Sequence, residues 1–175
     1  GQPGFAMAQM FSYALFFWSM VAAAFFLCLP PLGVMLAGLL SALNPIAVHV
    51  GTHYWLDGPL LAFSAFSLAV FAAAIARRSW PLAACAGFIL GLASLIKITA
   101  FLVMPGFALL ALVLLERPKL KLFIGLSACL FATALLVQLP WEIWQWMVFG
   151  TPFPGWAGKP SQARIESNQY VRYLT

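Results

Sequence analysis

The chain has 175 residues, of which 64% are hydrophobic and only 7% are charged. Soluble domains carry about 25% charged residues, and disordered chains are rich in charge and poor in aromatic residues, so both classes are excluded. No Asp, Glu, Lys or Arg precedes Asp57. Such a stretch cannot form a water-exposed surface, so the composition predicts an integral membrane protein.

The net charge of +5 does not indicate a nucleic-acid partner. Most of the basic residues lie in two short loops between apolar runs, one at Arg77 and Arg78 and the other at Arg117, Lys119 and Lys121. Cytoplasmic loops of membrane proteins are enriched in Lys and Arg, so topology alone explains this placement. We therefore expect membrane lipids, and no nucleic acid, as partners.

Prolines, glycines and charged residues divide the chain into apolar runs. Most runs approach the ~20 residues that a helix needs to cross a bilayer, and none alternates as a barrel strand does. The six expected spans are Phe5–Leu29, Leu32–Val50, Gly58–Ala76, Pro81–Ile96, Ile98–Leu115 and Leu122–Leu139. The predicted fold class is an all-α integral membrane protein, a polytopic bundle of about six transmembrane helices with a truncated extracytoplasmic loop.

Two domains are expected, a transmembrane bundle over residues 1–139 and an interfacial segment over residues 140–175. Indole rings favour the headgroup region of a bilayer. Trp141 and Trp144 are three residues apart, so they would share one face of a helix lying flat on the membrane. The segment that begins at Gly150 cannot continue a helix, and it should open the extracytoplasmic loop.

The basic loops also predict which charged residues lie on the outer side of the membrane. If both loops are cytoplasmic, the chain between them crosses twice, and Lys97 lies near the opposite face. Asp57 stands one span before Arg77 and therefore lies on that same outer face. The tail from Pro140 emerges there as well. One topology thus places Asp57, Lys97 and the tail on one side.

A charged residue in a membrane span raises the free energy of insertion by about 2.5–3.5 kcal/mol, so its presence calls for a structural or functional explanation. Asp57 precedes Gly58 and Pro59, which is typical of a helix start. The ammonium of Lys97 could extend to the headgroups, or it could bind the phosphate of a lipid as a compact charge. A structural role and a functional role therefore remain open for Asp57 and for Lys97.

Three other side chains are candidates for chemistry. His49 and His53 precede Asp57 at spacings of four, so the three would share one face of a continuous helix and are weak candidates for metal ligation. An interfacial polar patch is the preferred interpretation of these three residues. Glu142 follows the last expected span and could be a base, a ligand or a solvated interfacial acid.

Three short motifs occur in an order that is typical of one enzyme family. Thr52 stands five residues before Asp57, the stretch Gly87–Lys97 has the pattern Gly-x3-Gly-Leu-x3-Ile-Lys, and the stretch Phe149–Pro152 reads Phe-Gly-Thr-Pro. In this order they resemble the GT-C membrane glycosyltransferases, and within them the protein O-mannosyltransferase-like group and the lipid A aminoarabinose transferases. The similarity runs from about Leu32 to Trp156.

The resemblance implies an enzyme that transfers a hexosyl or pentosyl group from a polyprenyl-phosphate sugar to a lipid, glycan or protein acceptor. It implies a bacterial inner (plasma) membrane location, with the active site facing the periplasm or the outside. By analogy, Lys97 binds the donor phosphate and Asp57 supports the site, with His53 and Glu142 as additional outer-face residues. No cofactor is implied as certain, and a divalent metal is an open option.

The sequence also departs from the family pattern. Family members carry their catalytic acid in the first long outer loop, whereas residues 1–56 contain no carboxylate. We therefore expect an internal fragment that is inactive alone, with the general base upstream. Ile96 stands where the family has Thr, and Gly58 where it has Pro.

Two alternative functions remain at this point. In a membrane transporter, Lys97 and Asp57 would line a solute path, and internal repeats would be expected, of which the sequence shows none. In a non-catalytic membrane subunit, small residues such as Gly87 and Gly91 would pack against partner helices.

Overall fold

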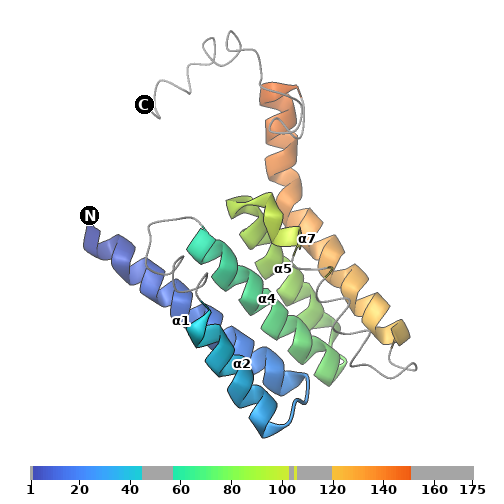
Figure 1. The fold of residues 1–175 in the computed structure, drawn as a ribbon. Helices are drawn as coiled ribbons and strands as arrows, with labels where there is room; N and C mark the ends of the chain where they lie inside the picture. Colours follow the sequence, from blue (N-terminus) through green and yellow to red (C-terminus); the bar gives the residue numbers. More distant parts are fainter. Residues whose placement is uncertain (1, 45–56, 103–104, 106–119, 151–175) are drawn as a thin grey trace. The chain divides into compact units, whose positions relative to one another are not determined.

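The computed structural model describes residues 2–44, 57–102, 105 and 120–150, and over these residues helices are the only regular secondary structure (Figure 1). The predicted all-α fold is therefore confirmed for this part of the chain. In chain order the elements are α1 (Gln2–Phe26), α2 (Pro31–Leu43), α4 (Asp57–Arg77), α5 (Trp80–Ile96), the short 3-10 helix η1 (Ile98–Leu102) and α7 (Leu120–Phe149).

Among the described residues, three helices are long and apolar enough to cross a membrane, namely Ala6–Phe26, Asp57–Arg77 and Lys121–Val148. The apolar helices α2 and α5 are shorter, with 13 and 17 residues. Six spans are thus not confirmed. Within the expected span 32–50, α2 ends at Leu43, because Asn44 adopts the extended backbone that a following proline favours, and residues 45–50 lie outside the described residues. The expected span 98–115 lies largely outside the described residues.

The turn between α1 and α2 begins before the two prolines. α1 ends at Phe26, three residues earlier than expected, and Cys28 then adopts the left-handed conformation with a φ of 58°. Pro31 opens α2, where its missing N–H is not needed. The hydroxyl of Tyr13 donates to the carbonyl of Ala42 at 2.6 Å, so α2 runs back antiparallel along α1.

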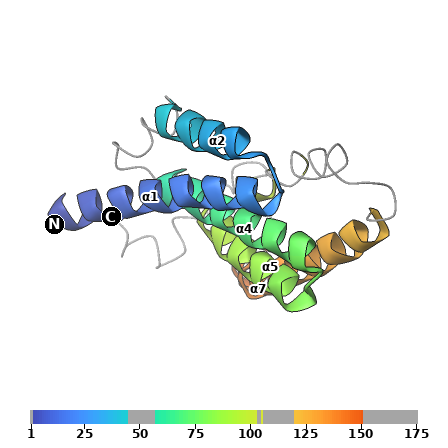
Figure 2. The same cartoon turned by 90° about the horizontal axis from the view of Figure 1, so that it is seen from below.

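α1 also packs against α4, and these two helices are parallel (Figure 2). At their beginnings, Gly58 lies against the side chain of Gln9. At their ends, the guanidinium of Arg77 lies over the ring of Phe26, 5.6 Å from its centroid. The beginning of α4, where Asp57 stands, is therefore next to the beginning of α1.

The helices α4 and α5 form an antiparallel hairpin with a tight turn at Arg78, whose φ is 52°. The side chain of Ser79 caps α5 by accepting a hydrogen bond from the N–H of Leu82. Midway along the pair, the hydroxyl of Ser67 donates to the carbonyl of Ala86 at 2.9 Å. Small residues at such a contact let two helix backbones approach closely.

The first part of α7 lies parallel to α5. Gly125 faces the ring of Trp80, Gly87 faces the carbonyl of Leu130, and Gly91 faces the side chain of Val137. The Gly-x3-Gly pattern of α5 therefore forms a close contact with α7, as small residues do between membrane helices. The basic start of α7 consequently lies at the same end of the hairpin as the turn at Arg78.

The last helix continues further than expected. Pro140 was expected to end it, but α7 runs through this proline to Phe149 and ends where Gly150 adopts a φ of 71°. Membrane helices tolerate proline, because neighbouring groups can satisfy the freed carbonyl. By its contacts the chain divides into two units, residues 1–137 and 138–175, with the division close to the proline.

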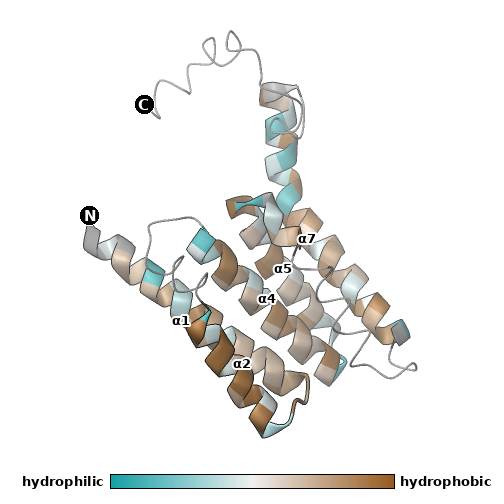
Figure 3. Ribbon diagram, in the orientation of Figure 1, coloured by the Kyte–Doolittle hydropathy of each residue, from teal (hydrophilic) through white to brown (hydrophobic). Residues whose placement is uncertain are grey.

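Apolar residues predominate along the helices, as the colouring of the ribbon by hydropathy shows (Figure 3), and many of their large side chains are exposed. Met7, Met10, Leu40 and Leu136 are each about two-thirds or more exposed. Soluble monomers rarely expose apolar patches of this kind, whereas lipid is a suitable solvent for them. The surface therefore agrees with the membrane association that the composition predicts.

Replacing Gly87 tests the contact between α5 and α7. A Cβ at this position would collide with the backbone carbonyl of Leu130, which cannot move without its helix. We expect Gly87→Val to lower the free energy of unfolding in detergent by ~1–3 kcal/mol. Gly4 is the matched control, because nothing lies within 4 Å of a Cβ there. Gly4→Ala should preserve or raise stability, and an equal loss in both variants would contradict the packing.

Candidate functional site

The structure brings together two of the residues singled out in the sequence, Asp57 and Lys97. Asp57 is the first residue of α4, and Lys97 directly follows the last residue of α5. Because these helices form an antiparallel hairpin, the start of one meets the end of the other. The backbone N–H of Lys97 donates to the carbonyl of Ala93, which fixes its Cα at the helix end.

The Nζ atom of Lys97 lies 3.0 Å from Oδ1 of Asp57, which is a direct ion pair. The Lys97 side chain is 52% exposed and the Asp57 side chain 30%. The carboxylate stands at a helix N-terminus and the ammonium at a helix C-terminus, so each also has a favourable interaction with a helix dipole. Exposed ion pairs of this kind contribute only about 0–1 kcal/mol to stability.

The arrangement leaves hydrogen-bonding capacity open on the lysine. A protonated lysine has three N–H donors. Among the residues that the structure describes, Asp57 alone accepts from Nζ. The exposed ammonium is therefore accessible to an anion from solution, and phosphate oxygens are suitable acceptors for it.

Three basic residues of the described part of the chain stand at the other end of the hairpin. Arg77 and Arg78 stand at its turn, and Lys121 lies in the first turn of α7, which packs alongside α5. The ion pair and this basic group are separated by the length of α4, about 31 Å for 21 residues. The two ends of the hairpin thus differ in charge.

Glu142 belongs to the unit of residues 138–175 and is described there by itself. Its Oε1 accepts a hydrogen bond of 2.8 Å from Gln138, one turn earlier, while its Oε2 is buried and has no hydrogen-bond partner among the described residues. The rings of Trp141 and Trp144 stack with centroids 4.9 Å apart. The expectation that these two residues share a helix face is therefore confirmed.

The proposed metal ligands are only partly within the described residues. His49 and His53 lie outside them, so the structure does not test a site with Asp57. Within the described ranges, no group of three His, Cys, Asp or Glu side chains is close enough to hold a metal ion.

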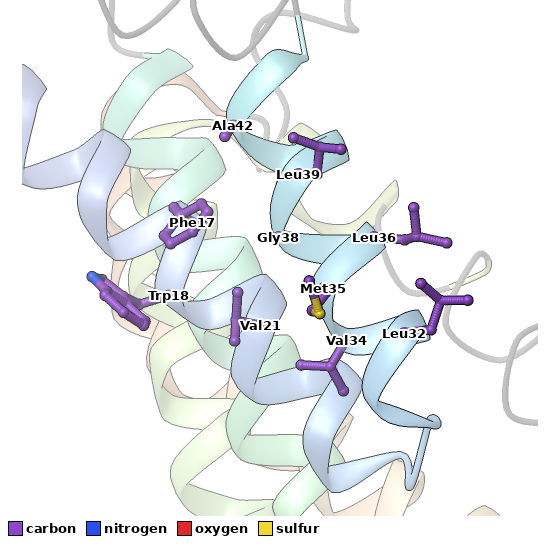
Figure 4. A pocket seen from close by; sticks show the side chains of 10 residues that line it. All are labelled: Phe17, Trp18, Val21, Leu32, Val34, Met35, Leu36, Gly38, Leu39 and Ala42. Carbon is purple, nitrogen blue, oxygen red and sulfur yellow. The ribbon is translucent and has the colours of Figure 1, made fainter.

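Two features were not predicted from the sequence. One is the hydrogen bond from Gln138 to Glu142, which the spacing of four residues could have indicated. The other is an apolar groove of about 560 Å³ between α1 and α2 (Figure 4). Its lining includes Phe17, Trp18 and Val21 from α1, and Met35, Gly38 and Leu39 from α2.

Comparisons with known proteins leave the site to be interpreted from its own residues. No known family, no curated protein and no solved structure matches this chain.

Labelling from either side of a sealed vesicle tests whether the charged ends lie on opposite sides of the membrane. The native cysteines are replaced by alanine, and single cysteines are introduced as Asp57→Cys, Lys97→Cys, Arg78→Cys and Lys121→Cys. We expect an impermeant maleimide to reach the first two from one side and the other two from the opposite side, because the helix packing separates them. Labelling of Asp57→Cys and Arg78→Cys from the same side would contradict this arrangement.

Proposed function

We propose that this chain is part of a membrane glycosyltransferase that uses a polyprenyl-phosphate sugar as donor, with Lys97 binding the donor phosphate. The observation that carries the proposal is the position of the Lys97 ammonium, exposed beside Asp57 at the end of the hairpin opposite Arg77 and Arg78. Since basic residues mark the cytoplasmic side, the ion pair would face the outside. The resemblance of the sequence motifs gives the same lysine this role.

The chemistry of the donor fits such a position. A polyprenyl chain dissolves in the hydrocarbon of the bilayer, so its phosphate reaches the headgroup region, where helix ends lie. During transfer, the bond between the sugar carbon and the phosphate oxygen breaks, and the electron pair stays on the phosphate. A fixed cation next to this oxygen stabilises the charge as it develops.

A general base is also needed, to take the proton from the acceptor hydroxyl as the new bond to the sugar forms. The proposal assigns this base to a carboxylate outside residues 1–175. Glu142 and His53 are proposed as additional residues of the site on the outer face. In this proposal Asp57 acts on Lys97 rather than on the acceptor.

The apolar groove between α1 and α2 is not required by the proposal. α1 packs on α4, and α4 packs on α5, so α4 lies between the groove and the helix that carries Lys97 (Figure 2). In a bilayer the groove would be filled by lipid hydrocarbon.

The position of the charges favours an enzyme over a transporter. Solute sites in transporters lie near the middle of the bilayer and are formed by interrupted helices. Here the ion pair lies at the ends of α4 and α5, and the middle of this hairpin is filled with buried alanines such as Ala72 and Ala86. A non-catalytic subunit would need no exposed lysine at this position.

Binding of farnesyl phosphate to the full chain in a phosphate-free detergent tests the role of Lys97. We expect Lys97→Ala to weaken binding about 10- to 100-fold, because a hydrogen bond to a charged group is worth about 1.5–3 kcal/mol. Calorimetric titration measures this affinity, and farnesol should bind both proteins equally.

Lys121→Ala is the matched control, since it removes one exposed lysine at the opposite end of the bundle. It should leave the affinity for farnesyl phosphate unchanged. If the two lysine variants lost affinity equally, binding would depend on net charge and the proposed site would be wrong.

A further inference from the structure

We infer that Asp57 is a built-in counter-ion of Lys97, which the donor phosphate displaces when it binds. This inference rests on the proposed function. It adds that an anion must displace Asp57 before it can bind Lys97. It follows from the contact between the two side chains, because Oδ1 of Asp57 already occupies a donor of the Lys97 ammonium at 3.0 Å.

The charges of the site make displacement necessary. The ion pair is neutral as a whole, so it attracts an anion weakly from a distance. A phosphate that reached Nζ while the Asp57 carboxylate stayed in place would put two negative groups side by side on one ammonium. Like charges at such short range repel strongly. The two anions therefore compete for Lys97, and the phosphate binds as the carboxylate leaves.

The surroundings of the pair allow this exchange. Both side chains are partly exposed, at 52% and 30%, so water can solvate the carboxylate that is released. Asp57 is also in the first turn of α4, where free backbone N–H groups and the helix dipole stabilise a carboxylate. The backbones of both residues can stay in place, because only the side chains need to rotate.

The exchange would make the site selective among anions. A ligand with a single weak charge must separate the existing pair before it gains the same interaction, so its net gain is small. A phosphate group presents several oxygens and a higher charge, and it can use the remaining N–H donors of Lys97 as well. The counter-ion thus favours phosphate over carboxylate or chloride ions.

The test is the affinity of the full chain for farnesyl phosphate in a phosphate-free detergent, compared between wild type and Asp57→Asn. We expect the variant to bind about two- to fivefold more tightly, which is the range that removal of a competing exposed ion pair allows. The gain should shrink at high salt, which screens exposed charges. In the Lys97→Met background, Asp57→Asn should have no effect, because no ammonium remains to compete for.

Glu116→Gln is the matched control, because it removes one carboxylate from the expected cytoplasmic loop and changes the net charge equally. It should leave the affinity unchanged. An equal gain in both variants, or unchanged or weaker binding by Asp57→Asn, would overturn the counter-ion role while leaving phosphate binding by Lys97 intact. Equal binding by wild type and Lys97→Met would overturn both proposals.

A comparison of inorganic phosphate with farnesyl phosphate distinguishes a free phosphate from a lipid phosphate as the ligand. We expect Asp57→Asn to tighten the binding of both, with the farnesyl compound bound more tightly in each protein. Equal affinities for the two would support displacement by a free phosphate and overturn a lipid as its source.

Discussion

The close packing of α4 on α5 is the constraint on which the rest of the site depends. Buried alanines and the hydrogen bond from Ser67 to the carbonyl of Ala86 hold the two helices together along their length. Because the turn at Arg78 joins one end of the pair, the other end brings Asp57 and Lys97 together although they are 40 residues apart. The ion pair is thus a consequence of apolar packing, and it contributes little to it.

The same packing separates a basic group of residues from the Asp57–Lys97 ion pair. Arg77, Arg78 and Lys121 stand at one end, and the neutral pair stands at the other. In a bilayer such a separation determines orientation, since basic groups remain on the cytoplasmic side. A phosphate site at the opposite end would therefore face the outside, where a lipid-linked donor could present its headgroup. In the proposed exchange, Asp57 would neutralise the Lys97 ammonium until a more highly charged anion displaces it.

The sequence predicts the features that depend on local chemistry. The helical fold, the break before Pro31 and the turn at Gly150 all follow from apolar runs and breakers. Charge placement predicts that Asp57 and Lys97 lie on the same side, but their direct contact depends on how α4 packs on α5. The continuation of α7 through Pro140 could not be predicted, because a proline ends a helix only where no other group satisfies the freed carbonyl. Likewise the groove between α1 and α2 depends on how two apolar faces meet, which composition does not specify.

A distance measurement by solid-state NMR tests the central claim most directly. Lysine is labelled with ¹⁵N in the full chain, and the ¹⁵N–³¹P dipolar coupling to bound farnesyl phosphate is recorded, with Lys97→Met used to assign the Lys97 signal. The account predicts a coupling for this signal that corresponds to direct contact between Nζ and a phosphate oxygen. A bound phosphate that couples to another lysine, and leaves the Lys97 signal unchanged, would contradict the account.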